Sequence, residues 1–565
     1  MAIDYQAMGG NARAPFTLKV HRGEGVALLA MNWRDGEPPE DLVGFGIEYC
    51  EPGSTRFLIA RNRLNFEGTP NPAGERSFPT LAAPIQKFRW VVFPFNADLP
   101  GKFTFRVTPV FMNGDGMLST GESQTASLAL ASQTYPGKLN VCFTRGYVAS
   151  QAFVDRYVSA GPVSTLLPAK GDDGPDFVPT HPKADEALAW MGFEARREIL
   201  KLLDDALADP ERGEVHVVAY DLNQKDVIDR LERLGPRLKI IIDDSAPHKE
   251  AGSAENQSEA RLKASAGAGN VKRQHMGQLQ HNKMIIVGGS VQRAVCGSTN
   301  FTWRGFFVQS NNAILVQGRE AIRPFRDAWD DYWTQTGFGL SRSADWQPLG
   351  LAGIDAKVTF SPHDRTKARL KEVADDMLTA ETSLFYSLAF LNQTSGPVTD
   401  AVEAITNSDV FTYGISDRRT GFELLKPDGN PAPVFFSRLE KNLPAPFKPE
   451  PNTGMGTNMH HKFVVLDFDT DKARVWMGSY NFSITADGSN GENLMLIRDR
   501  KVATSYMVEA VRIFDSYSFR VAQTDAKKAR KTLELRKPPA LSGKDPWWKE
   551  DYTDPVKIRD RLLFA

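Results

Sequence analysis

One stretch of this chain occurs twice, and this repetition constrains the fold more than any other feature. The first copy runs from Gln280 to Val287 and is followed by Gly297-Ser298-Thr299-Asn300-Phe301. The second copy runs from Met459 to Asp467 and is followed by Gly478-Ser479-Tyr480-Asn481-Phe482. Each copy has a His, one spacer, a Lys, an apolar run and then Gly-Ser-x-Asn-Phe. A single His-x-Lys pair is usually part of a solvated surface, but two matching copies predict one site built from two halves.

The spacing within each copy indicates the chemistry. Alternate residues of a strand share a face, so the His and the Lys of each copy point the same way. A neutral imidazole can attack phosphorus, and a second, protonated imidazole can protonate the leaving oxygen. Lys, Asn and Ser groups can hold the phosphoryl oxygens while charge develops there. Because each half supplies one His, we expect His281 and His460 to lie close together in a site that needs no metal or cofactor.

These residues resemble the phospholipase D superfamily, whose HKD motif reads His-x-Lys-x4-Asp, followed by Gly-Ser-x-Asn. The second copy matches through His460, Lys462, Asp467 and the Gly478-Ser479-Tyr480-Asn481 segment. In the first copy Gly288 stands at the position of the Asp, and Gly297 comes two residues late. The resemblance covers roughly residues 136–525. The missing Asp bears on how rigidly the first half is held, whereas both His-Lys pairs are present.

The resemblance implies a ping-pong mechanism through a covalent phosphohistidine. It assigns His281 as the nucleophile and His460 as the acid-base partner, although the reverse order stays open because the order rests on analogy. The side chains implied to hold phosphate oxygens are Lys283, Lys462, Asn300 and Asn481, with Ser298 and Ser479 orienting them.

Three further polar residues are expected to support the site. Glu492 follows Gly478 at the same offset at which Asn311 follows Gly297, so each is expected to bind the second ring nitrogen of a catalytic His. Asp467 is expected to tie its strand to a neighbouring loop. His461 alternates to the opposite face and is expected to be structural, and His275, in the segment before His281, carries little weight.

The composition is that of a globular protein with little net charge. The chain has 565 residues, 41% of them hydrophobic and 24% charged, a net charge of −1 and a sequence pI near 6.8. Three cysteines are too few for a disulfide framework. No signal peptide and no apolar run long enough to span a bilayer is seen, so a cytoplasmic location is expected. The sequence leaves open export without a cleaved signal, and it does not set the oligomeric state.

The chain divides into four predicted parts. Residues 1–135 read as short alternating strands and resemble a fibronectin type III β-sandwich, with Trp33 as its core tryptophan; this domain is a spacer or a binding module. Residues 136–350 and 351–525 are predicted as two α/β lobes of the phospholipase D type, related by a pseudo-twofold, and 526–565 as a C-terminal tail. The basic run 526–537 is either a solvated helix face or a contact to anionic lipid or nucleic acid, and Trp547-Trp548 is expected to pack the tail onto the body.

Within the lobes, the apolar spacing predicts a helix over 184–208 and a second helix near 225–234. The stretch from Ala246 to Gln280 has almost no large apolar residues and is predicted to be a loop. A Pro-rich insertion at about 426–455 precedes the second His-Lys pair, as that loop precedes the first.

Three functions fit these observations. The first is a phosphodiesterase that hydrolyses phospholipid headgroup esters, with transphosphatidylation also open and a possible contact to the membrane surface. The second is a metal-independent nuclease that acts on DNA or RNA; the neutral overall charge disfavours it, whereas Lys263, Lys272 and Arg273 near the site favour any polyanion. A non-catalytic scaffold is the third, and the two intact His-Lys pairs argue against it.

Overall fold

The computed structural model describes residues 4–131, 133–146, 153–334, 338–389, 391, 396–418, 421–425, 431–435 and 459–565. The chain forms two compact units. The first consists mainly of Met1–Ser132 and Thr504–Ala565, and the second mainly of Gln133–Leu425 and Pro431–Ala503. This division runs through α11 (Arg500–Lys528). The predicted domain boundaries at 135, 350 and 525 stay predictions.

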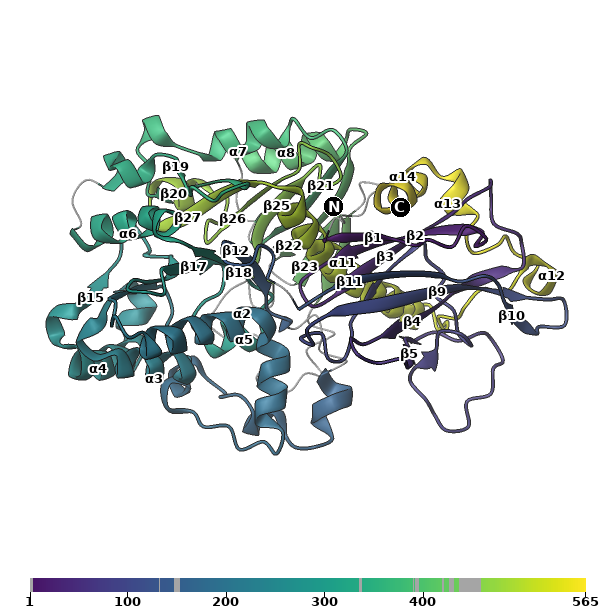
Figure 1. Cartoon of the computed structure of the whole chain (residues 1–565), viewed down its shortest axis with the longest axis horizontal. Coiled ribbons are helices and arrows are strands. Elements are labelled where there is room, and N and C mark those ends of the chain that lie inside the picture. Colours follow the sequence, from purple (N-terminus) through teal and green to yellow (C-terminus); the bar gives the residue numbers. More distant parts are fainter. Residues whose placement is uncertain are drawn as a thin grey trace. The chain divides into compact units, whose positions relative to one another are not determined.

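The first unit contains two larger antiparallel sheets (Figure 1), beside the short pair of β6 (Arg61–Asn62) and β7 (Phe78–Pro79). One has the order β1 (Gln6–Met8), β2 (Phe16–Arg22), β3 (Ala27–Trp33) and β8 (Arg89–Val92). The other has the order β10 (Leu118–Thr120), β9 (Lys102–Met112), β4 (Leu42–Cys50) and β5 (Phe57–Ile59), and β11 (Gln124–Ala129) also pairs with β9. Every second residue of β2, and of β9 from Phe103 to Pro109, is buried, as expected of strands that cover a core with one face.

One hydrophobic core is shared by both of these sheets. It includes Phe16 and Leu29 from the first sheet and Phe45 and Phe105 from the second, and Trp33 packs against it while half-buried. The C-terminal segment joins the same core through Trp548, as predicted for the Trp pair. That segment forms α12 (Pro539–Ser542), α13 (Glu550–Thr553) and α14 (Pro555–Phe564). The likeness of this unit to fibronectin type III stays a prediction.

The second unit contains two mixed sheets. The first has the order β12 (Leu139–Phe143), β18 (Asn312–Gln317), β17 (Arg293–Gly297), β16 (Lys283–Val287), β13 (Val215–Ala219), β14 (Leu238–Asp243) and β15 (Val271–Gln274). The second has the order β19 (Gln347–Pro348), β20 (Asp355–Ser361), β27 (Glu492–Arg498), β26 (Arg474–Gly478), β25 (Lys462–Leu466), β21 (Ser383–Leu388), β22 (Phe411–Arg418), β23 (Gly421–Leu425) and β24 (Pro431–Phe435).

The repeated sequence corresponds to a repeated topology. In both sheets the strand that begins with the motif Lys (β16 or β25) pairs on one side with the strand that ends with the motif Gly (β17 or β26). On its other side lies a strand (β13 or β21) that is parallel to the next strand of the sheet. Strands β16 and β25 are buried along their whole length, which explains their unbroken apolar runs. The prediction of a mixed α/β structure with two similar halves therefore describes the strand order of this unit.

Helices flank these sheets (Figure 1). Those of the first half are α2 (Ala184–Ala208), α3 (Lys225–Leu234), α4 (Ala254–Ala266), α5 (Trp303–Phe307) and α6 (Arg319–Thr334). Those of the second half are α7 (Leu370–Met377), α8 (Pro397–Thr406) and α10 (Ile484–Gly488). The predicted helices over 184–208 and near 225–234 are confirmed. Among the described residues, no helix is long and apolar enough to cross a membrane.

The prediction of a loop between Ala246 and Gln280 is wrong. This segment forms the short helix η6 (Ala246–Lys249), then α4 and β15. The buried face of α4 is built mostly from small or polar residues, with Leu262 as its one large apolar side chain, so the apolar spacing that marks a helix is missing. Ser253 caps α4 by accepting a hydrogen bond from the amide of Asn256. In the Pro-rich insertion, β24 pairs with β23, and 426–430 and 436–455 lie outside the described residues.

Candidate active site

The two copies of the motif position their residues in the same way. His281 and His460 lie two residues before the first residues of β16 and β25, which are Lys283 and Lys462. Gly478 ends β26 with a positive φ of 156°, and a Cβ there would lie 2.1 Å from the carbonyl oxygen of Asn493. Only glycine allows this close approach, so the motif glycine lets the following Ser-x-Asn turn toward the site.

His281 is held by a carboxylate from the other half of the unit. Its Nδ1 lies 2.7 Å from Oε2 of Glu492, and both side chains are buried. Burial lowers the pKa of His281, and the carboxylate offsets this only in part. Burial opposes ionisation of Glu492, but His281 and Lys283 hold its pKa below the usual value. Glu492 is therefore a carboxylate that accepts the Nδ1 hydrogen of a neutral His281, which leaves the lone pair on Nε2.

His460 is held in turn by the first half. Its Nδ1 lies 2.9 Å from Oδ1 of Asn311 and 3.0 Å from the carbonyl oxygen of Ser298. Both partners accept hydrogen bonds, so Nδ1 carries the hydrogen. The amide of His460 also donates to the carbonyl oxygen of Ser310. Burial lowers the pKa of His460 strongly, and the charges of Lys462 and Lys283 add to this effect. Each half thus supplies the residue that holds the histidine of the other.

The two lysines are buried among these groups. Each donates a hydrogen bond from Nζ to the carbonyl oxygen of the His two residues before it. Burial lowers the pKa of Lys283 to about 8, against the opposing effect of Glu492. Two buried ammonium groups beside two histidines form a site that favours an anion.

The serine of each motif copy hydrogen-bonds to the residue that contacts the histidine of the other copy. The Ser298 hydroxyl donates to Oδ1 of Asn311 at 2.9 Å. The Ser479 hydroxyl accepts from the backbone amide of Asn493 at 3.0 Å and hydrogen-bonds to Glu492. The structure therefore places both serines against protein partners, and their predicted role toward a phosphate stays a prediction.

The motif asparagines have unused capacity for hydrogen bonding. Within the described part of the chain, the side-chain oxygens of Asn300 and Asn481 are buried without a hydrogen-bond partner. The amide group of Asn300 donates to Oδ2 of Asp221 at 2.5 Å. Buried polar atoms are normally satisfied, so both positions agree with a site that is completed by a ligand. Contact of these groups with a phosphate stays a prediction.

Asp467 ties its strand to a neighbouring loop, as predicted. Its Oδ1 accepts hydrogen bonds from the amides of Glu381 and Thr382 at 2.9 and 2.8 Å, and Oδ2 pairs with Arg474. In the first half Gly288 stands in place of this Asp. Asp209, the residue after α2, makes comparable hydrogen bonds instead. Its carboxylate accepts from the amides of Glu211 and Gly213 and from the Ser290 hydroxyl.

Two histidines take the places predicted for them. His461 is fully buried, with its ring edge-on to Phe143 and Phe463, as expected for a structural residue. His275 is half-exposed and pairs with Asp244.

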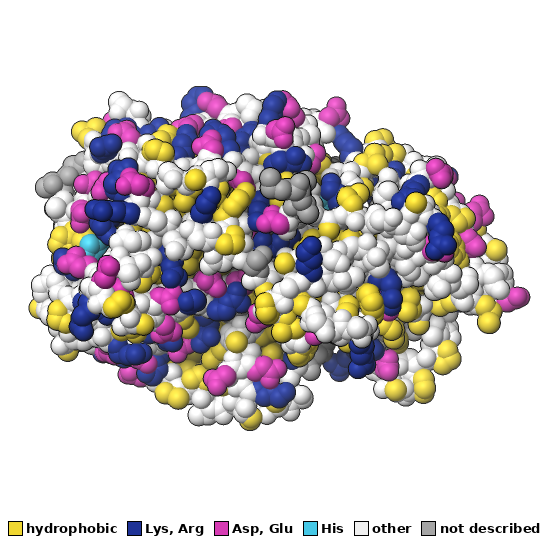
Figure 2. All heavy atoms as spheres, in the orientation of Figure 1, with side chains coloured by type: hydrophobic (Ala, Val, Ile, Leu, Met, Phe, Trp, Pro, Cys, Tyr) yellow, Lys and Arg dark blue, Asp and Glu magenta, His cyan; other side chains and the backbone are white. Residues whose placement is uncertain are grey.

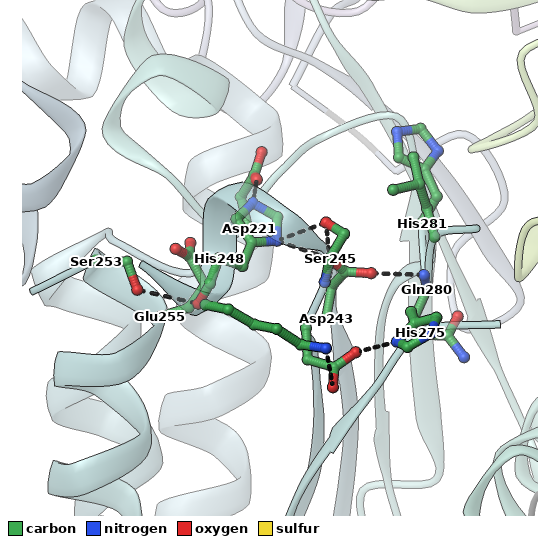
Figure 3. Close-up of polar contacts among 12 residues, drawn as sticks. Asp221, Asp243, Ser245, His248, Ser253, Glu255, His275, Gln280 and His281 are labelled. Carbon is green, nitrogen blue, oxygen red and sulfur yellow. Dashed lines mark hydrogen bonds and ion pairs between the residues drawn. The ribbon is translucent and has the colours of Figure 1, made fainter. Parts of the chain in front are cut away.

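Sequence analysis missed a cluster of titratable residues beside His281, composed of Asp221, Asp243, His248 and Glu255 (Figure 3). Asp221 and Asp243 come at or just after the ends of neighbouring parallel strands, which is the one signal that could have grouped them.

Comparison with known proteins identifies the domain that carries this geometry. Residues 205–333 and 381–513 match the family described as "Cardiolipin synthase, PLD-like domain". The two segments are therefore each similar to a PLD-like domain. All of the motif residues and the four residues of the cluster fall within them.

Individual relatives of the PLD-like domains are distant or short. A "Phospholipase D" of Rickettsia prowazekii is 46% identical over 48 residues, which are 8% of this chain and 22% of that protein. Nuc of Salmonella typhimurium, a phospholipase D family member, is 23% identical with a TM-score of 0.21, and the match covers 25% of this chain and 88% of that one. A phosphatidylserine synthase of Haemophilus influenzae is 11% identical with a TM-score of 0.38, covering 60% and 91%.

Proposed function

We propose that the protein is a phosphodiesterase that works through a covalent phosphohistidine on His281. The observation that carries the proposal is the contact of Nδ1 of His281 with Glu492, since it holds a neutral imidazole with Nε2 as its basic atom. A second histidine, His460, completes an acid-base pair, and Lys283 and Lys462 supply positive charge for a phosphate. This arrangement supports nucleophilic catalysis followed by hydrolysis.

In the first step, Nε2 of His281 attacks phosphorus while the bond from phosphorus to the leaving oxygen breaks. His460 gives the proton from Nε2 of its imidazolium to that oxygen. The negative charge of the bound phosphodiester raises the pKa of His460 and favours this protonated form. In the second step, His460 takes a proton from water, the hydroxide oxygen attacks phosphorus, and the bond to His281 breaks. Both histidines return to their starting states.

Glu492 stabilises the positive imidazole ring of the phosphohistidine, because its carboxylate faces the Nδ1 hydrogen of that ring at 2.7 Å. Asn311 offers His460 only a neutral acceptor. The difference between the two partners favours His281 as the nucleophile and His460 as the acid and base. The nucleophile keeps its positive charge for the whole lifetime of the intermediate, whereas the acid loses its charge when it gives up its proton.

We propose a phospholipid as the substrate. The description of the matched family names cardiolipin synthase, an enzyme that makes a lipid, and the Rickettsia relative is named a phospholipase D. The nucleic-acid alternative loses the support expected from Lys263, Lys272 and Arg273. Lys263 and Arg273 both pair with Glu259, and Lys272 donates to the carbonyl oxygen of Trp333. On the face shown in Figure 2, basic and acidic side chains intermingle instead of forming a continuous basic surface.

The test is turnover of phosphatidylcholine vesicles beside single-stranded DNA, double-stranded DNA and RNA, by the wild type and by the His281→Ala and His460→Ala variants. We expect release of the headgroup from the vesicles by the wild type alone. Cleavage of nucleic acid that depends on both histidines would replace the lipid substrate with a nuclease function. Turnover that survives both substitutions would contradict the site itself.

A further inference from the structure

His248 lies outside both copies of the motif, and both of its ring nitrogens face carboxylates (Figure 3). It is the one buried residue of the short helix η6, and its Nδ1 lies 2.7 Å from Oδ2 of Asp243. Its Nε2 lies 2.8 Å from Oδ1 of Asp221. Burial opposes the charge, but these two carboxylates raise the pKa of His248 to about 10. The ring is therefore an imidazolium that donates from both nitrogens.

Each of these two carboxylates also accepts a hydrogen bond from a residue of the repeated motif. Oδ1 of Asp243 accepts a hydrogen bond of 2.7 Å from the amide of Gln280, the residue directly before His281. Oδ2 of Asp221 accepts from the side-chain amide of Asn300. His248 thus lies between the segment that delivers His281 and the motif asparagine of the same half.

An aromatic ring makes a third connection. The ring centre of Tyr220 lies 4.9 Å from that of His248 and 4.6 Å from that of His281, edge-on to both. Lys283 lies over the same tyrosine ring at 4.7 Å. A shift of His248 would therefore move the packing surface of His281 as well as its backbone.

We propose that His248 is a positioning residue of the active site, whose imidazolium ties Asp221 to Asp243 and thereby fixes Asn300 and the entry to His281 in one geometry. The proposal rests on the proposed function, because it assigns His248 to the reaction of His281. In the second half the amide of Ala389 donates to the carbonyl oxygen of His461, as the amide of Tyr220 donates to that of Asn282, so Ala389 corresponds to Tyr220. In the sequence Phe390 then stands where the first half has Asp221. The contacts of His248 with Asp221 and Asp243, called the clamp below, therefore belong to the first half.

A metal ion is the competing explanation for this cluster. Ligand atoms of Asp221, His248 and Glu255 lie within 4.8 Å of one another. A metal ion would bind the lone pair of a neutral imidazole nitrogen. In the imidazolium, Nε2 of His248 carries a hydrogen that faces Asp221 and has no lone pair for a metal. Glu255 is also committed in part, because its Oε1 accepts from the amide of Leu222 at 3.0 Å. The observed contacts favour the ion pair, and the experiment below distinguishes the two.

The variants follow from the charge balance of the clamp. His248→Gln removes the cation and leaves Asp221 and Asp243 facing each other. Adding Asp221→Asn removes one negative charge and restores a continuous chain of donors, because the introduced asparagine can donate to the introduced glutamine and still accept from Asn300. His275→Gln is the matched control, since His275 lies in the same region and pairs with Asp244, next to Asp243, but is half-exposed.

The first readout is the pKa of His281, measured by NMR of ring-labelled histidines without substrate. The charged or polar groups that face His281 include Glu492, Lys283, Lys462, His460 and Tyr220. Those around His248 include Asp221, Asp243, Ser245, Glu255 and Tyr220. Loss of the imidazolium leaves more negative charge near His281, so we expect its pKa to rise in His248→Gln and to return toward the wild-type value in the double variant. An unchanged pKa of His281 in His248→Gln would overturn the proposal.

The second readout is the rate of phosphoenzyme formation. We expect a fall of up to about 100-fold in His248→Gln, with little change in KM, and a partial recovery in the double variant but no effect of His275→Gln. Loss of wild-type turnover in EDTA, restored by a divalent ion, would replace the clamp with a metal site. If the wild type forms no phosphoenzyme, the proposed function fails, but the pKa of His281 still reports on the clamp.

Discussion

Oε2 of Glu492 lies 2.7 Å from Nδ1 of His281, although the two residues come from different copies of the repeated stretch. The reciprocal contact, between Asn311 and His460, uses an amide where the first uses a carboxylate. The two histidines are thus held in the same way, but the partner of His281 is charged and the partner of His460 is neutral. We relate the different roles proposed for the two histidines to this difference.

Replacement of Glu492 by Gln should slow the reaction while the hydrogen bond to His281 is kept. The amide oxygen can still accept from Nδ1, but the charge that stabilises the phosphohistidine is lost. Because the carboxylate raises the pKa of His281, its loss lowers that pKa further. We expect kcat to fall by about 100-fold and the acidic limb of the profile of kcat/KM against pH to move to lower pH. A limb that moves to higher pH would contradict this account.

Replacement of Asn311 by Asp should act on His460 instead. A carboxylate at this position faces Nδ1 of His460 and raises its pKa, so the protonated acid persists to higher pH. We expect the basic limb of the pH profile to move upward, with the acidic limb unchanged. Asn311→Leu, which offers no acceptor, serves as the comparison and should lower kcat without that upward shift.

The two ways of holding the motif strands can be tested by stability. Asp467→Asn should lower the free energy of unfolding by about 1–3 kcal/mol, because the carboxylate accepts two backbone amides and pairs with Arg474. Asn tolerates the positive φ of 50° at this position, so backbone strain does not contribute. Asp209→Asn should destabilise the first half in the same direction. Asp471→Asn is the control, since its side chain is 99% exposed; a loss equal to that of Asp467→Asn would refute the bracing role.

The first unit gives a prediction for stability against pH. Burial, with a contribution from the charge of Lys19, lowers the pKa of His21 to about 3. Below the ordinary pKa of about 6.5 the unfolded chain binds a proton at this position and the folded one does not, so stability falls as the pH falls from 6.5 toward 3. We expect His21→Gln to flatten this dependence by up to about 1.4 kcal/mol per pH unit. Chemical unfolding of both proteins between pH 4 and 7 measures it, and parallel curves would contradict it.

The paired motif could be predicted because it depends on local spacing. The offsets of Asn311 and Glu492 after the motif glycines indicated that both would hold a histidine. The strand order then brought each of them to the histidine of the other half, which spacing within one copy does not determine. Asp467 was likewise predictable, since the motif contains it.

Other parts of the site leave no repeated pattern. Asp221, Asp243 and His248 lie at separate points of the chain and come together through the parallel pairing of β13 with β14. Asp209 replaces the missing Asp from a different point of the chain. Helix α4 was missed because small and polar residues line its buried face, so its apolar periodicity is weak.

The central claim is that phosphorus becomes bound to His281. Acid-quenched reactions of the wild type with a nitrophenyl phosphodiester, analysed by peptide mass spectrometry, locate the phosphorylated residue. We expect the label on His281, its absence in His281→Ala, and its slow formation in His460→Ala, because this leaving group departs without a proton. A label on His460 in the wild type would reverse the two roles, and turnover without any label on either histidine would contradict the covalent mechanism.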